Sequence, residues 1–170
     1  MIAMARRRIL LDVRVIRPLV TREPIDTQAL LLLLLCRIGE LSPWICSSQL
    51  SVLLAAVRKG DDASHPRKSA AVCGMMDCIH VAMAGEADVR AVCAAQKEDL
   101  NEALLRHAAH SHRALAIVGP NEPATSTRNR TGNCCPAGAE AHMDVEVLSA
   151  RGLFNLLEKR YAVSYVLVTS

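Results

Sequence analysis

Residues 9–16 read Ile-Leu-Leu-Asp-Val-Arg-Val-Ile, and this stretch decides how the chain begins to fold. Its later apolar side chains alternate with Asp12 and Arg14. Alternation with a period of two is the pattern of a strand that buries one face and leaves the other in water. Pro18 and Pro24 follow, and proline interrupts regular structure. The stretch therefore predicts one half-buried strand that ends before these prolines.

A run of six leucines, Leu30–Leu35, lies inside the next predicted element, a helix over residues 27–38. Asp26 or Thr27 suits the N-cap position, because a short polar side chain there can accept hydrogen bonds from the first free backbone N–H groups. Gly39 suits the residue after the helix, where a left-handed backbone is common. These signals predict a helix with well-marked ends.

A second helix is predicted to begin after Ser42 and to end before Gly60. Ser42 is a preferred N-cap residue, Pro43 is tolerated in the first turn, and Gly60 is favoured just after the last turn. Because only a short link separates this helix from residues 27–38, we interpret the pair as a Leu-rich αα-hairpin.

Two amphipathic helices are predicted next, over residues 66–84 and 87–112. In each, apolar residues recur at the spacing of one helical face. Residues 113–118, Arg-Ala-Leu-Ala-Ile-Val, are typical of a short buried strand. At the C-terminus, a strand at 144–148, a helix at 149–160 and a strand at 161–168 predict a βαβ-like unit.

The composition bounds the fold class. The chain has 170 residues, 51% of them hydrophobic, but only 2% aromatic, so aliphatic side chains must build the core. A wholly disordered chain, a collagen, a coiled-coil rod and a multi-span membrane protein are excluded. We expect a helix-rich α/β or α+β fold; the scarcity of aromatic residues is equally compatible with a chain that lacks a well-defined fold.

Four segments are predicted along the chain. Residues 1–26 form a basic N-terminal arm with one strand, and residues 27–118 form a helical core region. Residues 119–142 contain three prolines, three glycines and three asparagines, and are predicted to be a flexible loop or linker. Residues 143–170 form the βαβ-like segment, which is too short to fold alone and must pack on the core.

The basic excess lies in the arm. Residues 1–22 hold six arginines and one acid, whereas the whole chain has a net charge of only +3. Through Arg6, Arg7 and Arg8 such an arm can bind RNA or an anionic membrane surface. We expect no specific recognition of DNA. A solvated first strand is the simpler interpretation of the same residues.

Residues 29–57 are the segment most compatible with a membrane anchor. However, Arg37 and Glu40 interrupt it, and its uncharged part is shorter than the roughly 20 residues that a spanning helix needs. The seven cysteines do not form a disulfide pattern and mostly lie in apolar stretches. A cytoplasmic location is therefore predicted, with membrane association as the alternative.

The densest cluster of metal-binding residue types is His107-Ala-Ala-His110-Ser-His112. Imidazoles at this spacing can bind zinc or copper, provided that the helix ends there so that the three rings converge. The alternative is three solvated histidines near a helix C-terminus, where a positive charge is favourable. The metal site at His107, His110 and His112 is the strongest candidate site in the sequence.

Two other groups of reactive residues are weaker candidates. Cys73, Asp77 and His80 have helical spacing, but Asp77 would separate the thiol from the imidazole, whereas a nucleophile needs its base beside it. Cys134 and Cys135 lie in the predicted loop, where two unpaired thiols are the simplest interpretation. None of the common phosphate-binding, hydrolase or zinc-protease motifs occurs. The sequence therefore names no catalytic residue and no resident cofactor.

These observations favour a small protein that acts through contacts with an unknown protein partner, using the exposed remainder of the Leu-rich hairpin. Three alternatives remain open. They are a membrane-associated protein anchored by residues 29–57, a transition-metal-binding protein that uses the three histidines, and a chance open reading frame with no selected function.

Overall fold

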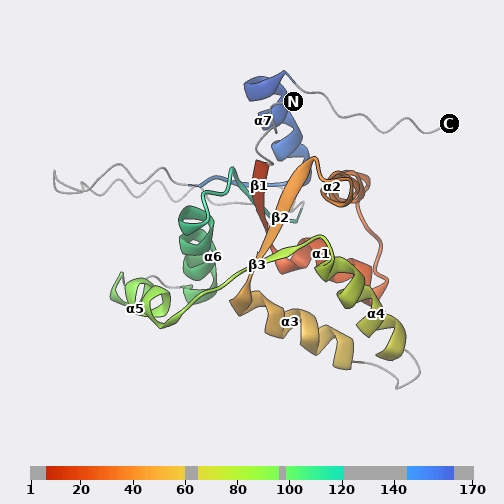
Figure 1. Cartoon of the computed structure of the whole chain (residues 1–170), viewed down its shortest axis with the longest axis horizontal. Helices are drawn as coiled ribbons and strands as arrows, with labels where there is room; N and C mark the ends of the chain where they lie inside the picture. The colour runs from red at the N-terminus through yellow and green to blue at the C-terminus, as the bar shows by residue number, and fades with distance from the viewer. Residues whose placement is uncertain (1–6, 60–64, 96–98, 121–144, 163–170) are drawn as a thin grey trace.

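The computed structural model describes residues 7–59, 65–95, 99–120 and 145–162 (Figure 1). Within them the chain is an α/β fold with seven helices and one five-stranded, all-parallel sheet. The strands are β1 (Arg7–Leu11), β2 (Leu41–Cys46), β3 (His80–Ala82), β4 (Ile117–Val118) and β5 (Val147–Leu148). The helices are α1 (Val13–Thr21), α2 (Thr27–Arg37), α3 (Ser47–Arg58), α4 (His65–Met76), α5 (Glu86–Ala94), α6 (Leu100–Ser111) and α7 (Ala150–Tyr161).

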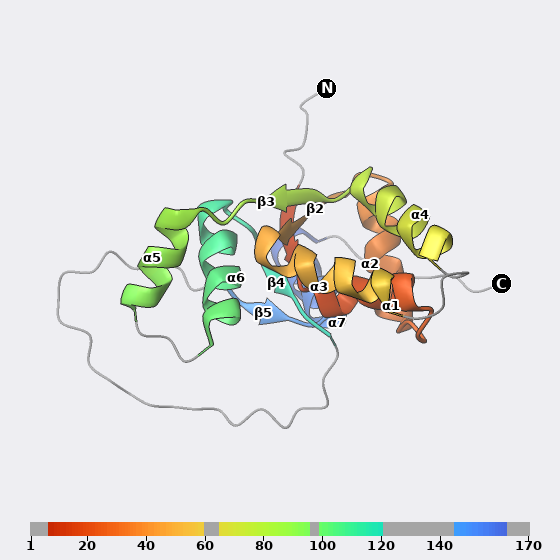
Figure 2. The same cartoon turned by 90° about the horizontal axis from the view of Figure 1, so that it is seen from below.

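The strand order, β3-β2-β1-β4-β5, is Rossmann-like. The chain moves outward from β1 to β3, then returns to place β4 on the other side of β1. Because parallel crossovers are right-handed, a reversal of direction moves the connecting helices to the opposite face of the sheet. Accordingly, α1 to α4 lie on one side of the sheet and α6, with α5 packed on it, lies on the other (Figures 1 and 2).

The first predicted strand is confirmed only as far as Leu11. Asp12 then caps α1, where its carboxylate accepts a hydrogen bond from the backbone N–H of Arg14 at 2.8 Å. Val13, Ile16 and Val20, which are spaced three and four residues apart, are all buried on one helical face. The strand prediction was wrong beyond Leu11 because so short a stretch fits both the two-residue period of a strand and the 3.6-residue period of a helix. The Asp12 cap favours the helix.

The predicted αα-hairpin is wrong. Of its second predicted helix, only Ser47–Arg58 (α3) is helical. Leu41–Cys46 instead form β2, a central strand between β1 and β3. Pro43 pairs in register with Ile9. Proline has no N–H for a strand ladder and is rare in central strands, whereas it is common in the first turn of a helix. This is why Ser42-Pro43 was misread as a helix start.

Helix α2 confirms the prediction for residues 27–38. The Asp26 carboxylate accepts from the backbone N–H groups of Gln28 and Ala29. At the other end the N–H of Gly39 donates to Cys36 O and that of Glu40 to Leu35 O. With Gly39 at φ 83°, this is the Schellman arrangement that ends helices without a side-chain cap.

The two long amphipathic helices predicted next are each divided. α4 ends at Met76, and His80–Ala82 form the edge strand β3. The second predicted helix is α5 followed by α6, and Asp99 caps α6 by accepting from Asn101 and Glu102 N–H. Helical apolar spacing continued across both breaks, so periodicity alone did not reveal them.

The C-terminal prediction is confirmed in part. β4 lies inside the strand predicted at 113–118, β5 inside the one at 144–148, and α7 matches the helix at 149–160. The strand predicted at 161–168 is wrong at its first two residues, because Tyr161 belongs to α7 and Ala162 is the left-handed C-cap of that helix. Residues 163–168 lie outside the described residues. The same holds for residues 121–142 of the predicted loop.

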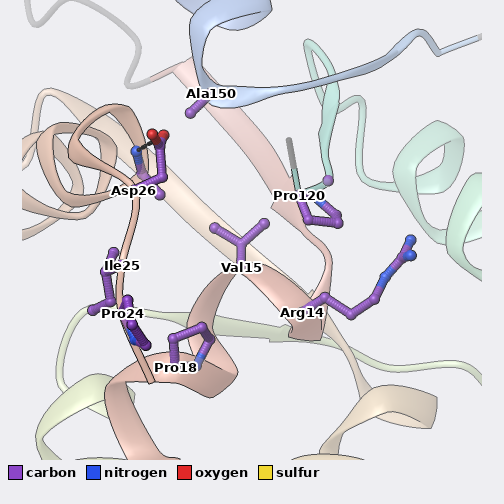
Figure 3. A pocket seen from close by; sticks show the side chains of 10 residues that line it. Arg14, Val15, Pro18, Pro24, Ile25, Asp26, Pro120 and Ala150 are labelled. Atoms are coloured by element: carbon purple, nitrogen blue, oxygen red, sulfur yellow. Dashed lines mark hydrogen bonds between the residues drawn. The ribbon is translucent and has the colours of Figure 1, made fainter. Parts of the chain in front are cut away.

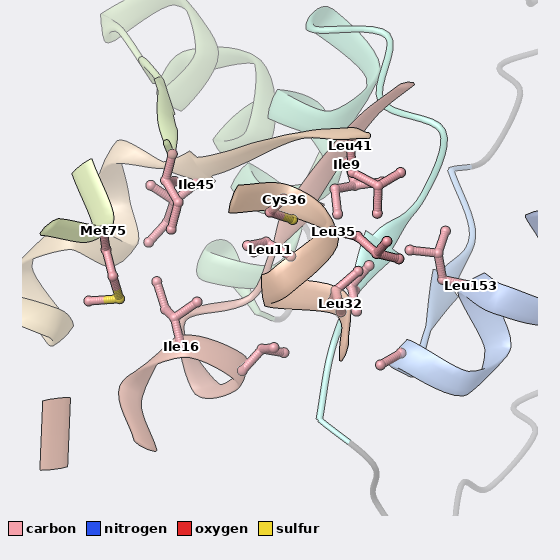
Figure 4. Close-up of a cluster of buried hydrophobic side chains, with 14 of the residues drawn as sticks. Ile9, Leu11, Ile16, Leu32, Leu35, Cys36, Leu41, Ile45, Met75 and Leu153 are labelled. Carbon is pink, nitrogen blue, oxygen red and sulfur yellow. The ribbon is translucent and has the colours of Figure 1, made fainter. Parts of the chain in front are cut away.

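The core is aliphatic, as the composition predicts. On the face of α1 to α4, Ile9 and Leu11 of β1 pack with Leu32 and Ile45, and none of these side chains is exposed (Figure 4). On the other face Leu10 packs on α6. β1 is therefore buried on both faces, the usual state of a central parallel strand rather than the half-buried strand predicted.

Candidate functional site

A hollow lies at the carboxyl edge of the sheet, where β1, β4 and β5 lead into their following segments (Figure 3). Its volume is about 210 Å³. In open α/β sheets, ligands bind at the carboxyl edge where the strand order reverses, which here lies between β1 and β4. The walls are Arg14, Val15, Pro18, Pro24, Ile25, Asp26, Ala29, Gly119, Pro120 and Ala150.

The start of α1 beside this pocket has its hydrogen-bond donors occupied. Val13 N–H donates to Gln49 Oε1 at 3.1 Å, and Arg14 N–H donates to Asp12. Val15 N–H donates to the Asp12 backbone oxygen at 3.0 Å. A phosphate needs such N–H groups free, and the Asp12 carboxylate already compensates the positive end of the helix. The pocket is therefore unsuited to the diphosphate that Rossmann-type sites cradle.

Arg14 is also engaged near this pocket. Its guanidinium donates to both Asp12 carboxylate oxygens, at 3.1 Å each, and forms an ion pair with this buried side chain. Asp26 caps α2, and the other walls are mainly apolar side chains of the first two helices and of Pro120. The pocket is thus small and mainly apolar, and its two charged residues, Arg14 and Asp26, are already hydrogen-bonded within the chain.

The three histidines of the predicted metal site have different surroundings. His107 Nε2 lies 2.8 Å from Asp88 Oδ1 on α5. His112 caps the end of α6 and lies against the Trp44 ring, with 4.9 Å between ring centroids. His110, in the last turn of α6, is exposed. In the part of the chain that the structure describes, no three His, Cys, Asp or Glu side chains are grouped to hold a metal ion. The metal site stays a prediction from spacing.

The His107–Asp88 contact joins α5 to α6. The pKa of Asp88 is lowered, first because its carboxylate accepts a hydrogen bond from Gly85 N–H at 2.6 Å, and second because of His107. The pair was not predicted, because both residues fall within the single helix predicted at 87–112, where they would lie many turns apart.

Cys73, Asp77 and His80 do not share a helical face. Cys73 is exposed on α4, Asp77 follows the end of that helix, and His80 begins β3. Cys134 and Cys135 lie outside the described residues. Burial raises the pKa of the Cys36 thiol on α2 to about 12, with a smaller contribution from Cys78. Cys36 is therefore held as a neutral thiol.

Helix α2 carries an exposed aliphatic row. Leu30 and Leu34 are each 43% exposed and Ile38, just after the helix, is 70% exposed. They are spaced four residues apart and therefore lie on one side of the helix. The opposite side, with Leu32 and Leu35, is buried in the core. Because Leu30–Leu35 are all leucine, their pattern does not show which side of the helix faces the core. The exposed row was therefore not predicted.

Residues 29–57, the predicted membrane anchor, divide into α2, β2 and α3. None of the helices within the described ranges is long and apolar enough to cross a membrane. Searches for a matching family model, curated protein or solved structure find none. The fold assignment therefore rests on the strand order alone.

Proposed function

We propose that this protein acts through contacts with another protein, made by the exposed row Leu30, Leu34 and Ile38. The supporting observation is that three large aliphatic side chains at successive helical turns remain in water. Single exposed apolar residues are ordinary, but a contiguous row favours an interaction site. A row with four-residue spacing is also the ridge that packs into the groove of another helix.

The row indicates the chemistry of the partner. Arg37 lies in the last turn of α2, between Leu34 and Ile38 in sequence, and is exposed. None of the ion pairs among the described residues includes it. A partner with an apolar groove and a carboxylate at its rim complements both features. A second copy of the chain is one such candidate, because Glu40 is exposed close by in sequence.

The test uses the full chain with a photo-crosslinking amino acid at Leu34, and the same group at exposed Asn155 on α7 as the control. We expect a discrete protein adduct, including a covalent dimer if the partner is a second copy, at position 34 only. The recovered partner should bind the Leu34→Gln/Ile38→Gln variant at least tenfold more weakly. A Leu54→Gln variant, whose leucine on α3 is 54% exposed, should bind normally. Equal adducts at positions 34 and 155, or none, overturn the proposal.

The pocket at the carboxyl edge supports a second candidate, the binding of a small apolar ligand. Its position at the reversal of strand order is the observation that favours it. A fragment that binds there should shift the amide NMR signals of Val15, Ala29 and Gly119, and Ala29→Phe, which narrows the pocket, should abolish the shifts. Shifts that persist in Ala29→Phe contradict this candidate.

A further inference from the structure

A stack of aromatic rings lies on the sheet face that α6 covers only in part. The Trp44 ring of β2 contacts the His80 ring of β3, with 5.0 Å between centroids and 37° between planes. It also contacts the His112 ring at the end of α6, at 4.9 Å and 32°. Three residues far apart in sequence thus form one set of neighbouring π-faces, which we call the ring stack.

The ring stack is accessible at its outer ring. α6 packs in one cluster with Leu10, Cys46, Ala82 and Ile117, which lie in β1 to β4. β3 is an edge strand and has only three residues. At its first residue His80 is exposed, and Trp44 is half-buried beside it. Neither α5 nor α6 buries the outer ring of the stack.

Positive charge lies next to the ring stack. The Arg8 guanidinium of β1 is 5.6 Å from the centre of the Trp44 ring and donates to the His112 backbone oxygen at 3.2 Å. Arg113 follows His112 directly and is exposed. No ion pair among the described residues includes Arg8 or Arg113. Both guanidinium groups therefore retain donors for an anion.

The charge extends along the amino edge of the sheet. Arg7 lies over the Tyr161 ring at 4.1 Å, which brings the basic last turn of α7 to the start of β1. The end of α2, with Arg37, leads into β2 at this same edge. Six basic residues here oppose four acids, Glu40, Asp77, Glu146 and Glu158. The basic residues are Arg7, Arg8, Arg37, Arg113, Lys159 and Arg160.

We propose that this face binds single-stranded nucleic acid without sequence preference, with a base stacked against the ring stack and adjacent phosphates held by Arg8 and Arg113. Proteins that bind single strands in this way combine stacking rings with a basic surface that follows the backbone. A membrane surface fits less well, because the rings come from two strands and a helix end rather than from the apolar face of an amphipathic helix. This site is distinct from the α2 row.

The test uses the full chain and a fluorescein-labelled 12-nucleotide oligouridine, with oligodeoxythymidine and anionic phosphatidylserine vesicles as parallel probes. We expect saturable anisotropy changes with one or both oligonucleotides and quenching of Trp44, the only tryptophan. The logarithm of affinity should fall with the logarithm of salt concentration with a slope of about −1.4 for two phosphate contacts.

Variants separate the two kinds of contact. His80→Ala should weaken binding about tenfold through lost stacking while leaving the salt slope unchanged. Arg8→Ala/Arg113→Ala should lower the affinity and reduce the slope toward zero. Arg90→Ala, which removes an exposed arginine paired with Glu86 on α5, is the matched charge control and should bind normally. Unchanged thermal unfolding of each variant shows that the fold is retained.

Three outcomes overturn the proposal. They are the absence of saturable binding to either oligonucleotide at low salt, an Arg90→Ala effect as large as that of the double variant, and binding to vesicles but not to oligonucleotides. Preference for RNA over DNA, or equal affinity for both, is consistent with it and identifies which single strand the surface accepts.

Discussion

At the scale of the residue, Asp12 determines how the first strand ends. Asp12 is 6% exposed, and its carboxylate caps α1 and pairs with Arg14. In many sheets of this order a glycine-rich turn at the same place leaves room for phosphate. Here β1 passes into α1 through one acidic residue, so the position where a phosphate would bind holds a carboxylate of the chain itself.

We expect Asp12→Ala to lower the free energy of unfolding by about 1–2 kcal/mol, because the N-cap hydrogen bond is lost. Asp12→Asn keeps an oxygen that can accept the same bond and should lose much less. Urea denaturation monitored by circular dichroism measures both variants. If Asp12→Asn is as unstable as Asp12→Ala, the charge and the Arg14 pair, rather than the cap, carry the stabilisation.

Cys36 should react slowly in the folded protein, because its pKa of about 12 leaves almost no thiolate at pH 8. Cys73 and Cys93, which are exposed, should be alkylated by iodoacetamide first, with Cys36 labelled only after unfolding. Peptide mass spectrometry identifies the order. Labelling of Cys36 as fast as Cys73 in native protein contradicts this prediction.

The raised pKa of Cys36 also predicts how stability depends on pH. As pH rises, the Cys36 thiol ionises in the unfolded chain before it ionises in the folded protein. The stabilisation from the buried neutral thiol is therefore complete below about pH 9 and is lost as pH rises toward about 12. The stability difference between wild type and Cys36→Ala should therefore shrink over this range. A difference that is constant from pH 8 to pH 11 contradicts it.

At the scale of the element, α2 shows how identical residues acquire different roles. Six consecutive leucines place some side chains in the core and others in water, because each residue turns the helix by about 100°. Leu32 is fully buried, whereas Leu34 is 43% exposed. The buried side contributes most of the packing that stabilises the fold, and the exposed side is the surface that we propose for contacts with a partner.

We expect Leu32→Ala to cost about 2–5 kcal/mol of stability through the cavity it leaves. Leu34→Ala, two residues away in the same helix, should cost less than about 1 kcal/mol. Chemical denaturation compares them directly. Equal losses would mean that Leu34 is also buried in solution, and the proposed contact row would then be wrong.

The elements differ in how far local sequence predicts them. α2 was predicted because its end signals, Asp26 and Gly39, agree with its apolar run, and α7 was predicted from its apolar residues alone. β2 was missed because Pro43 argued against a central strand. Pro43 pairs with Ile9 of β1 but precedes Trp44, where the pairing of β2 with β3 begins, so it lies in the part of β2 that has one partner strand. No candidate site at the carboxyl edge was predicted, since its walls come from segments distant in sequence.

At the scale of the whole molecule, one sheet with two covered faces joins the N-terminal strand to α7 near the C-terminus. β1 pairs with β2 and β4, so Arg7 and Arg8 lie at the start of the central strand. The two largest hydrophobic clusters share this strand, which couples the stability of the two layers.

We expect one cooperative unfolding transition, with dispersed amide NMR signals in the folded state. Because β1 contributes to both layers, loss of either layer exposes the other. Far-UV circular dichroism and Trp44 fluorescence should therefore give coincident thermal curves. A broad, non-coincident transition would favour the chance reading frame, for which no selected packing is expected.

The sequence by itself determined the aliphatic character of the core, the capped helices α2 and α7, and the concentration of arginine at the amino end, because these depend on composition and on neighbours within a few residues. Only the tertiary structure decided that Leu41–Cys46 is a strand and that Asp12 ends one. It also brought Trp44 between His80 and His112. Strand pairing joins residues that are tens of positions apart, and the pattern of neighbouring residues does not specify which strands will pair.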